Sequence, residues 1–390
     1  MILRNRVNTK YLHMELQDFI DFRHEVHQHP ELSGEEYETK KRVARFIQMF
    51  NPDEIIEVGK TGLLFAFKGE LPGKSIMIRA ELDALPIQEI NELPYKSIIE
   101  NISHKCGHDG HLTILARLAF LLSQQKLIKG TAYLLFQPSE ENGMGAKEVF
   151  ASEKFREIHI DRVVALHNIP GYPIKSIILR NGSFTPAVRS IIVKFTGKTS
   201  HAAEPENGYN PGWAMADFLK EALTISNNNI HQDEFFLVTP VYTCMGEKSY
   251  GVSAGYGEVH LTVRSWRNNL LLEKSRILES LARKIGEENH LEIEIEWLQE
   301  FKANENKDEV VNDIRKAAKS LGLQIIERET PMKWGEDFGL FTELYEGAMF
   351  GLGSGENQAA LHNPDFDFPD ELIETGSLIF EKIVREYLNS

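Results

Sequence analysis

The chain has 390 residues, of which 42% are hydrophobic and 26% are charged, and its formal net charge is −15. This length is sufficient for two domains and for a core that needs no disulfide or structural metal. The acidic surface argues against nucleic acid and anionic membranes as partners. The two cysteines, Cys106 and Cys244, are too few for a disulfide framework and are typical of a reducing compartment.

The first residues do not predict export. Met1 to Lys10 carries charges, and the following segment is interrupted by His13, Glu15 and Asp18, so no signal peptide is expected. No apolar run reaches the length of a membrane-spanning helix. The cytoplasm is therefore the expected location.

The first half of the chain is predicted to alternate helices with strands. Apolar residues at helical spacing, with turn residues at their ends, predict helices over 14–29, 37–50, 108–123 and 143–152, the second being opened by a turn and cap at Ser33–Glu36. Short apolar runs bounded by glycine and proline predict strands over 61–67, 75–80, 131–137 and 162–166. This alternation predicts an α/β sheet covered on both faces.

The middle of the chain follows a different order. Strands are predicted over 189–195, 235–242, 258–266 and 291–297, with helices over 211–225 and 270–285. The order βαββαβ is that of the ferredoxin-like unit. The fold class is therefore α/β, with a mixed-sheet domain over 1–183 and 301–390 and an inserted ferredoxin-like α+β domain over 184–300.

The densest group of chemically active residues is His104-Lys105-Cys106-Gly107-His108-Asp109-Gly110-His111. Thiolate and imidazole are good ligands for zinc-like metals, and the helix predicted to start here favours a thiolate at its N-terminus. The alternative is a buried cysteine beside surface histidines.

Two adjacent carboxylates, Glu140 and Glu141, directly follow a predicted strand. One can bind a metal while the other takes a proton from water. The alternative is a solvated pair at a helix N-terminus, where acidic residues are stabilised in any case.

Two further histidines, His167 and His362, lie in His-Asn-Ile-Pro-Gly and Leu-His-Asn-Pro-Asp. Either alone reads as a hydrogen-bonded loop residue. Three of these four clusters, however, come where loops leave predicted strands, and open α/β sheets bind ligands there. One cysteine, three histidines and one glutamate are too many for a single tetrahedral zinc and favour two metals.

Two more residues have candidate roles. Asp83, two residues after Glu81 on the same strand face, is a candidate carboxylate behind a metal-bound histidine, where it would fix the tautomer. His201 follows the first strand of the inserted domain and is a candidate donor to the oxyanion of amide hydrolysis. An ordinary strand-end carboxylate and a surface histidine are the alternatives.

Eight motifs in order resemble the metal-dependent aminoacylase and carboxypeptidase superfamily, in its N-acyl-amino-acid amidohydrolase branch with hippurate hydrolase and auxin-conjugate hydrolase. The motifs lie at 27–32, 79–87, 106–111, 136–141, 167–171, 201–203, 335–338 and 361–364. Each motif is weak alone, whereas eight in the correct order are specific.

The resemblance implies a role for each position. The implied metal ligands are Cys106, His108, Glu141, His167 and His362. Glu140 would be the general base and later the proton donor, and His201 would steady the oxyanion from a lid that also dimerises. Two divalent ions, Zn or Mn with Co or Ni also permitted, would be the cofactor, and the protein would be a homodimer.

The chain departs from the family at several positions. Glu81 stands where aspartate is usual, and Asn142 and Met144 interrupt a glycine-rich stretch. Glu204 and Glu206 follow His-Ala-Ala where the branch has a histidine, and the segment 250–257 lacks the usual Asn-Val-Ile-Pro. The hydrolytic residues are retained, so these changes concern the substrate.

Three functions remain open on the sequence. The first is hydrolysis of N-acyl amino acids by a metal-activated water and Glu140. The second is a metallo-dipeptidase or aminopeptidase, in which Glu204 or Glu206 would bind a free amino group. The third is a binding protein that keeps the fold without catalysis.

Overall fold

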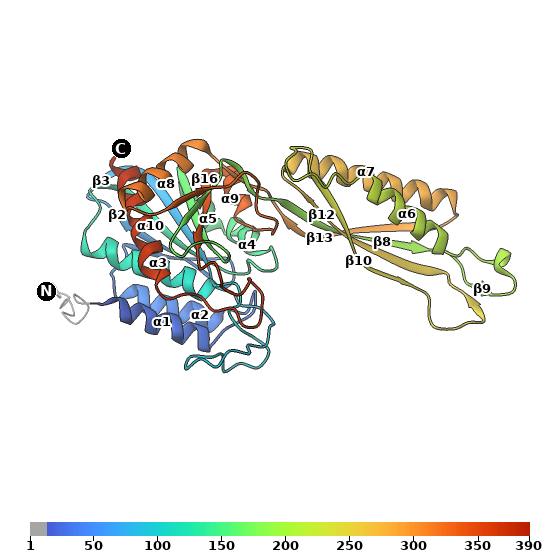
Figure 1. Ribbon diagram of the computed structural model, residues 1–390, viewed down its shortest axis with the longest axis horizontal. Coiled ribbons are helices and arrows are strands. Elements are labelled where there is room, and N and C mark those ends of the chain that lie inside the picture. Colours follow the sequence, from blue (N-terminus) through green and yellow to red (C-terminus); the bar gives the residue numbers. More distant parts are fainter. Residues whose placement is uncertain (1–13) are drawn as a thin grey trace. The chain divides into compact units, whose positions relative to one another are not determined.

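The computed structural model describes residues 14–390, which form two compact units (Figure 1). One unit comprises the chain up to residue 182 together with 305–328 and 340–390. The other comprises 183–304 with 329–339. The prediction that residues 1–10 hold no signal peptide lies outside the described residues. Within the described ones, none of the helices is long and apolar enough to span a bilayer.

These units differ from the predicted domain bounds at residues 183, 301–304 and 329–339. Residues 329–339 were assigned to the first domain but belong to the second unit. The backbone shows why, since N of Met332 donates to O of Phe184 at 2.8 Å. This stretch has no apolar periodicity that would have indicated the unit with which it packs.

The first unit is built on an eight-stranded mixed sheet, which confirms the predicted α/β fold class. Its strands lie in the order β1-β2-β4-β3-β5-β16-β6-β15. Pairs β3–β4, β3–β5, β5–β16 and β6–β15 are parallel, and pairs β1–β2, β2–β4 and β6–β16 are antiparallel. The strands are β1 (Glu54–Val58), β2 (Gly62–Lys68), β3 (Leu71–Glu81), β4 (Lys129–Gln137), β5 (Arg162–Ile169), β6 (Ile177–Leu179), β15 (Ile325–Glu327) and β16 (Glu346–Gly353).

Helices bury both faces of this sheet. Five of them contribute to one apolar core against the sheet: α1 (Leu16–Gln28), α2 (Tyr37–Gln48), α3 (His108–Gln124), α8 (Asp308–Ser320) and α10 (Leu372–Asn389). The alternate strand residues, such as Leu64, Met77 and Met349, are also buried, as expected for a sheet with two covered faces. The remaining helices are α4 (Gly145–Ala151), α5 (Glu153–Arg156) and α9 (Gly339–Leu344).

The second unit has the predicted βαββαβ order. Its antiparallel sheet has the order β10-β12-β8-β13, and α6 and α7 contribute with it to one apolar core. The elements are β8 (Ala187–Thr196), α6 (Gly212–Thr224), β10 (Phe236–Met245), β12 (Tyr256–Ser265), α7 (Asn268–Glu288) and β13 (Glu292–Phe301). Its shorter elements are β9 (Ser200–His201), which pairs with β11 (Val252–Ser253), and the 3₁₀ turn η2 (Pro205–Asn207). Two further short strands, β7 (Gly182–Thr185) and β14 (Asn304–Asn306), pair where the chain passes from one unit to the other.

The parallel strands place the candidate site at one edge of the first sheet. β3 ends at Glu81, β4 at Gln137, β5 at Ile169 and β16 at Gly353. Because the carboxyl ends of parallel strands meet at the same edge, the residues that follow them lie close together.

Candidate metal centre

Cys106 and His108 lie at the beginning of α3, with Gly107 as the N-cap residue between them. Gly107 has φ of 94°, in the left-handed region that favours glycine. A Cβ atom there would also lie only 2.5 Å from Oδ1 of Asn168. Glycine is therefore required both by the backbone and by the available space, and it allows two ligand-type side chains to be buried in one turn.

The five predicted ligands lie close together in the first unit. Sγ of Cys106 is 3.5 Å from Nε2 of His167. Oε2 of Glu141 is 3.6 Å from Nε2 of His362, and Oε1 of Glu141 is 3.8 Å from Nε2 of His108. Residues that are up to 256 positions apart in the sequence thus converge on one small volume.

The donor atoms form overlapping groups, each within 4.8 Å: Cys106 with His108 and His167, Cys106 with Glu141 and His362, and His108 with Glu140 and Glu141. Shared members are what a pair of bridged metal ions requires. The mixture of thiolate, imidazole and carboxylate suits zinc-like ions.

Nε2 of His108 tests whether this donor set fits a metal. The atom is buried and has no hydrogen-bond partner among residues 14–390. A buried polar atom without a partner costs about 1–3 kcal/mol. A divalent cation bound between Nε2 and the facing carboxylates would remove that cost, so the residues present fit a metal ion.

Asp83 lies on the other side of the same imidazole. Nδ1 of His108 is 2.9 Å from the carbonyl oxygen of Asp83 and 3.3 Å from its Oδ1. Burial opposes ionisation of Asp83, but its contacts with His108 hold the pKa of the carboxyl below its usual range. The carbonyl oxygen of Asp83 is thus the nearer acceptor for Nδ1, and the role of its carboxylate in orienting a metal-binding histidine stays a prediction.

The loop that carries Glu140 and Glu141 is fixed by a second buried carboxylate. Oε1 of Glu36 accepts the backbone N–H of Ser139 at 2.8 Å, and Oε2 accepts the hydroxyl of Thr61 at 2.6 Å. Ser139 has φ of 54°, so this turn is strained for a residue other than glycine. The predicted turn and cap at Ser33–Glu36 is confirmed, since Glu36 is the N-cap residue of α2, but its side chain makes no cap hydrogen bond and holds the glutamate loop instead.

His111 is a buried residue to which the sequence assigned no role. Its Nδ1 lies 2.7 Å from Oε2 of Glu81, and its Nε2 lies 2.6 Å from Oδ1 of Asn168. Burial lowers the pKa of His111 to about 3, and Nε2 accepts the backbone N–H of Asn168 at 3.1 Å. Glu81, which stands where the family usually has aspartate, thus contacts His111. His111 in turn contacts Asn168, the residue that packs on Gly107. The sequence did contain one indication that His111 belongs to the site, since His111 comes three residues after His108 and so lies on the same face of the helix.

His201 belongs to the second unit. It ends the short strand β9, is exposed, and its Nδ1 accepts the N–H of Ala203 at 3.1 Å. Its role in steadying an oxyanion stays a prediction.

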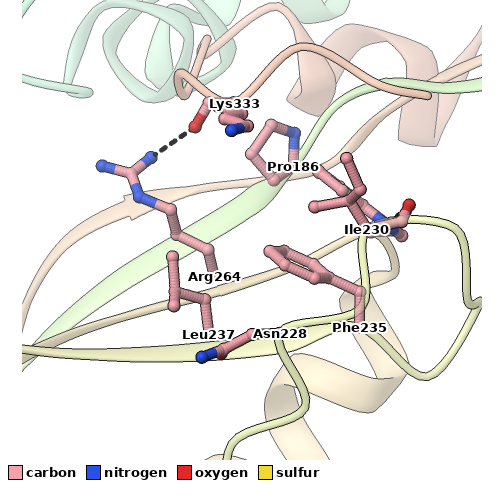
Figure 2. Close-up of a pocket in the computed structure, with 8 residues that line it drawn as sticks. Pro186, Asn228, Ile230, Phe235, Leu237, Arg264 and Lys333 are labelled. Carbon is pink, nitrogen blue, oxygen red and sulfur yellow. Dashed lines mark hydrogen bonds between the residues drawn. The ribbon is translucent and has the colours of Figure 1, made fainter.

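The second unit has a cavity of its own, of about 270 Å³. Figure 2 shows Phe235, Leu237 and Ile230 along it, together with Arg264, whose guanidinium donates to the carbonyl oxygen of Lys333 at 3.1 Å. None of the eight lining residues is acidic. Burial lowers the pKa of Arg264. The cavity therefore combines apolar walls with a partly buried cation.

Comparison with known proteins places the chain in a family. The model of peptidase family M20/M25/M40 matches residues 77–386. Hippurate hydrolase of Campylobacter jejuni is 31% identical over 378 residues, which are 96% of this chain and 98% of that protein. An N-acetyl-L-cysteine deacetylase of Bacillus subtilis is 31% identical over an alignment of 391 positions, which covers 99% of this chain and 91% of that protein.

A solved structure agrees with the sequence comparison. The YXEP protein of Bacillus subtilis, a dinuclear metal-binding peptidase of the M20 family, superposes with a TM-score of 0.83 at 28% identity and covers 96% of this chain and 98% of its own. The donor groups found here and this neighbour support two divalent metals as cofactor. The chain therefore belongs to peptidase family M20/M25/M40, as its motifs predicted, and is a hydrolase of amide bonds.

Proposed function

We propose that this protein removes the acyl group from an N-acyl amino acid by hydrolysis of the amide bond. The observation that carries the proposal is the placement of Glu140. It is buried, and its Oε2 lies 3.9 Å from Nε2 of His108, while its neighbour Glu141 faces both His108 and His362. We assign Glu140 to proton transfer and Glu141 to the ligand set, because only Glu141 also faces His362.

Cys106, His108, Glu141, His167 and His362 would hold the two ions. When bound, divalent ions act as Lewis acids on a carbonyl group and lower the pKa of water toward 7. Glu140 takes a proton from the attacking water and returns it to the amide nitrogen as the bond breaks, which contributes typically ~10²–10⁴-fold in rate. Asp83 keeps Nδ1 of His108 occupied, so that Nε2 faces the carboxylates.

The relatives support an N-acyl amino acid as substrate. They are a hippurate hydrolase, N-acetylcysteine deacetylases and N-acetyldiaminopimelate deacetylases. All act on an amide between an acyl group and an amino acid. The ions are zinc or manganese, with cobalt or nickel also compatible with the donor set.

Hydrolysis of dipeptides is the second candidate, favoured by one observation. Glu204 and Glu206 are exposed beside and within η2, three and five residues after His201. A free α-amino group is a cation and would find an acidic partner there. Turnover of a dipeptide in preference to its N-acetylated counterpart would favour this alternative.

The second unit is proposed to form a homodimer and to supply His201 as the oxyanion donor. β10 is an edge strand of its sheet, and Val241, Tyr242 and Met245 on it are exposed, as is Trp213 of α6. An exposed apolar edge strand is suited to pairing with another chain. Light scattering would show a dimer, and Val241→Lys would shift it to a monomer.

We also propose a reducing, cytoplasmic location, which the proposed thiolate ligand supports. Cys106 must carry a thiolate to act as a ligand, and within residues 14–390 neither Cys106 nor Cys244 forms a disulfide. An oxidising compartment would expose the thiol to loss of that function.

The decisive experiment is hydrolysis of a panel of N-acyl amino acids and dipeptides by metal-stripped protein reloaded with Zn²⁺ or Mn²⁺. Cleavage of N-acyl amino acids that returns only with metal is expected. Stoichiometric metal binding without cleavage of any member would contradict the proposed function and favour a binding protein.

A further inference from the structure

The segment that carries His362 has no regular structure. It runs from residue 354 to 371, between β16 and α10. His362 itself has φ of 66°, which is strained for a residue with a side chain. The position of this ligand must therefore be set by contacts outside its own segment.

Lys105, the residue before Cys106, contacts this segment twice. The backbone N–H of His362 donates to O of Lys105 at 2.7 Å. Nζ of Lys105 donates to the carbonyl oxygen of Phe366 at 2.8 Å and to Oε1 of Glu89 at 2.7 Å. The side chains of Lys105 and Glu89 are both fully buried.

The pair is part of a longer chain of buried charges. Glu89 lies 3.2 Å from Nε2 of His27, whose Nδ1 lies 2.9 Å from Asp109. Asp109 accepts from Arg23 at 2.8 Å, and Arg23 reaches the far end of the His362 segment through Asp370 at 2.6 Å. The segment is thus held at its middle by Lys105 and near its C-terminal end by Arg23, which also binds Asp109 of α3.

Stability alone does not explain a buried lysine. Removing an ammonium from water costs several kcal/mol, and well-packed apolar residues often stabilise a core equally well or better. What an ammonium adds is direction, because its acceptors have fixed positions. Here the acceptors are a carboxylate and one carbonyl oxygen, and that carbonyl belongs to the segment of His362.

We propose that Lys105 is a positioning residue that sets the place of His362 relative to Cys106. The inference rests on the proposed metal site, in which Cys106, Glu141 and His362 form one donor group. A shift of His362 affects that group and leaves the group of Cys106, His108 and His167 unchanged. Lys105 would therefore control the affinity for one metal of the pair.

The test is a titration of metal-stripped protein with Co²⁺, followed by the absorbance of the thiolate–cobalt complex and by metal content. The variant His362→Ala identifies which binding step uses His362. Lys105→Met removes the ammonium at similar length, and Lys105→Met with Glu89→Gln removes both charges, so that no unpaired carboxylate is buried. Lys194→Met is the matched control, since it removes a 2.7 Å pair with Glu294 in the second unit.

In both Lys105 variants, the Co²⁺ affinity of the binding step that uses His362 is expected to fall by about 10–100-fold, as for other residues that orient ligands. The other step and the Lys194→Met protein should match the wild type. If Lys105→Met does not fold, the double variant decides. The inference would be overturned if the Lys105 variants bound Co²⁺ with wild-type affinity in both steps, or lost affinity equally in both. A wild-type protein that binds no metal would instead refute the proposed function, before any variant is compared.

Discussion

Oδ1 of Asp83 lies 3.3 Å from Nδ1 of His108. Oδ2 of the same carboxylate accepts the backbone N–H of Glu141 at 2.9 Å and the hydroxyl of Ser33 at 2.7 Å. A single buried side chain therefore contacts one candidate ligand and accepts the backbone N–H of another. The two belong to segments that follow different strands, β3 and β4.

Replacement of Asp83 tests this relationship. Asp83→Asn keeps the shape but removes the charge that favours a proton on Nδ1 of His108. We expect metal affinity to fall by about 10–100-fold, measured by equilibrium dialysis with Zn²⁺. Ser33→Ala removes only one donor to the same carboxylate and should cost much less. Equal affinities for Asp83→Asn and the wild type would refute the orienting role.

Replacement of Glu140 separates proton transfer from metal binding. Glu140→Gln is expected to retain both metals, because the five proposed ligands are intact, and to lose about 10²–10⁴-fold in kcat. Metal analysis and steady-state kinetics on the same preparation provide the comparison. Wild-type turnover in Glu140→Gln would remove Glu140 from the mechanism.

Comparing substitutions at Gly107 and Gly171 tests how tightly the residues around the candidate metal centre are packed. Both have positive φ, of 94° and 83°, but a Cβ at Gly107 meets Asn168 at 2.5 Å, whereas one at Gly171 meets nothing within 4 Å. Gly171→Ala should cost about 1–2 kcal/mol for its backbone conformation. Gly107→Ala adds a clash and should cost about 2–5 kcal/mol. Urea unfolding measures both, and equal losses would contradict the steric argument.

His27 gives the stability a pH dependence. Burial lowers its pKa, but hydrogen bonds to Asp109 and Glu89 outweigh burial and the charge of Arg23 and raise the pKa of His27 to about 9. The nearby His104 is neutral, because burial lowers its pKa to about 3. Since the folded-state pKa of His27 lies above the unfolded value of about 6.5, its protonated form stabilises the fold fully below pH 6.5. This stabilisation is lost as the pH rises through 9.

The shift from 6.5 to about 9 corresponds to a contribution on the order of 3 kcal/mol at low pH. His27→Gln should therefore be much less stable than the wild type at pH 6, and the difference should shrink toward pH 10. The control is His159→Gln, since His159 is exposed and pairs with Asp161 at the surface. A difference in unfolding free energy that does not change with pH would show that His27 is neutral when folded.

The helices and strands that could be predicted are those whose own residues carry a clear apolar pattern. α3 and β4 combine a strong apolar pattern with glycine or polar residues at their ends, so both were predicted. β16 reads Glu-Gly-Ala-Met-Phe-Gly-Leu-Gly, with three glycines and no alternation. It is a strand because β5 and β6 pair with it on either side, which is information that a local pattern does not contain. The helices α8 and α10, left unassigned above, do have apolar residues at helical spacing.

The residues of the candidate site also fall into those that the sequence could predict and those that it could not. The spacing of Cys106 and His108 at a helix start indicates a metal ligand pair by itself, but nothing local relates them to His362. The ordered motifs supplied that connection. The buried charges of Lys105 and Glu89 could not be predicted, because a charged residue in a loop has the same appearance in the sequence whether it is solvated or paired.

The strand pair β5 and β16 also determines when the first unit can be completed during synthesis. The whole second unit is encoded between these two neighbours, and a ribosome that adds about 5–20 residues per second takes tens of seconds to cross that interval. During this time β5 has an unpaired edge, which is a site for aggregation. The inserted unit, whose strands are contiguous in the chain, can fold first. Nascent chains are therefore expected to need protection by chaperones at β5, and slower translation of residues 183–304 would lengthen that need.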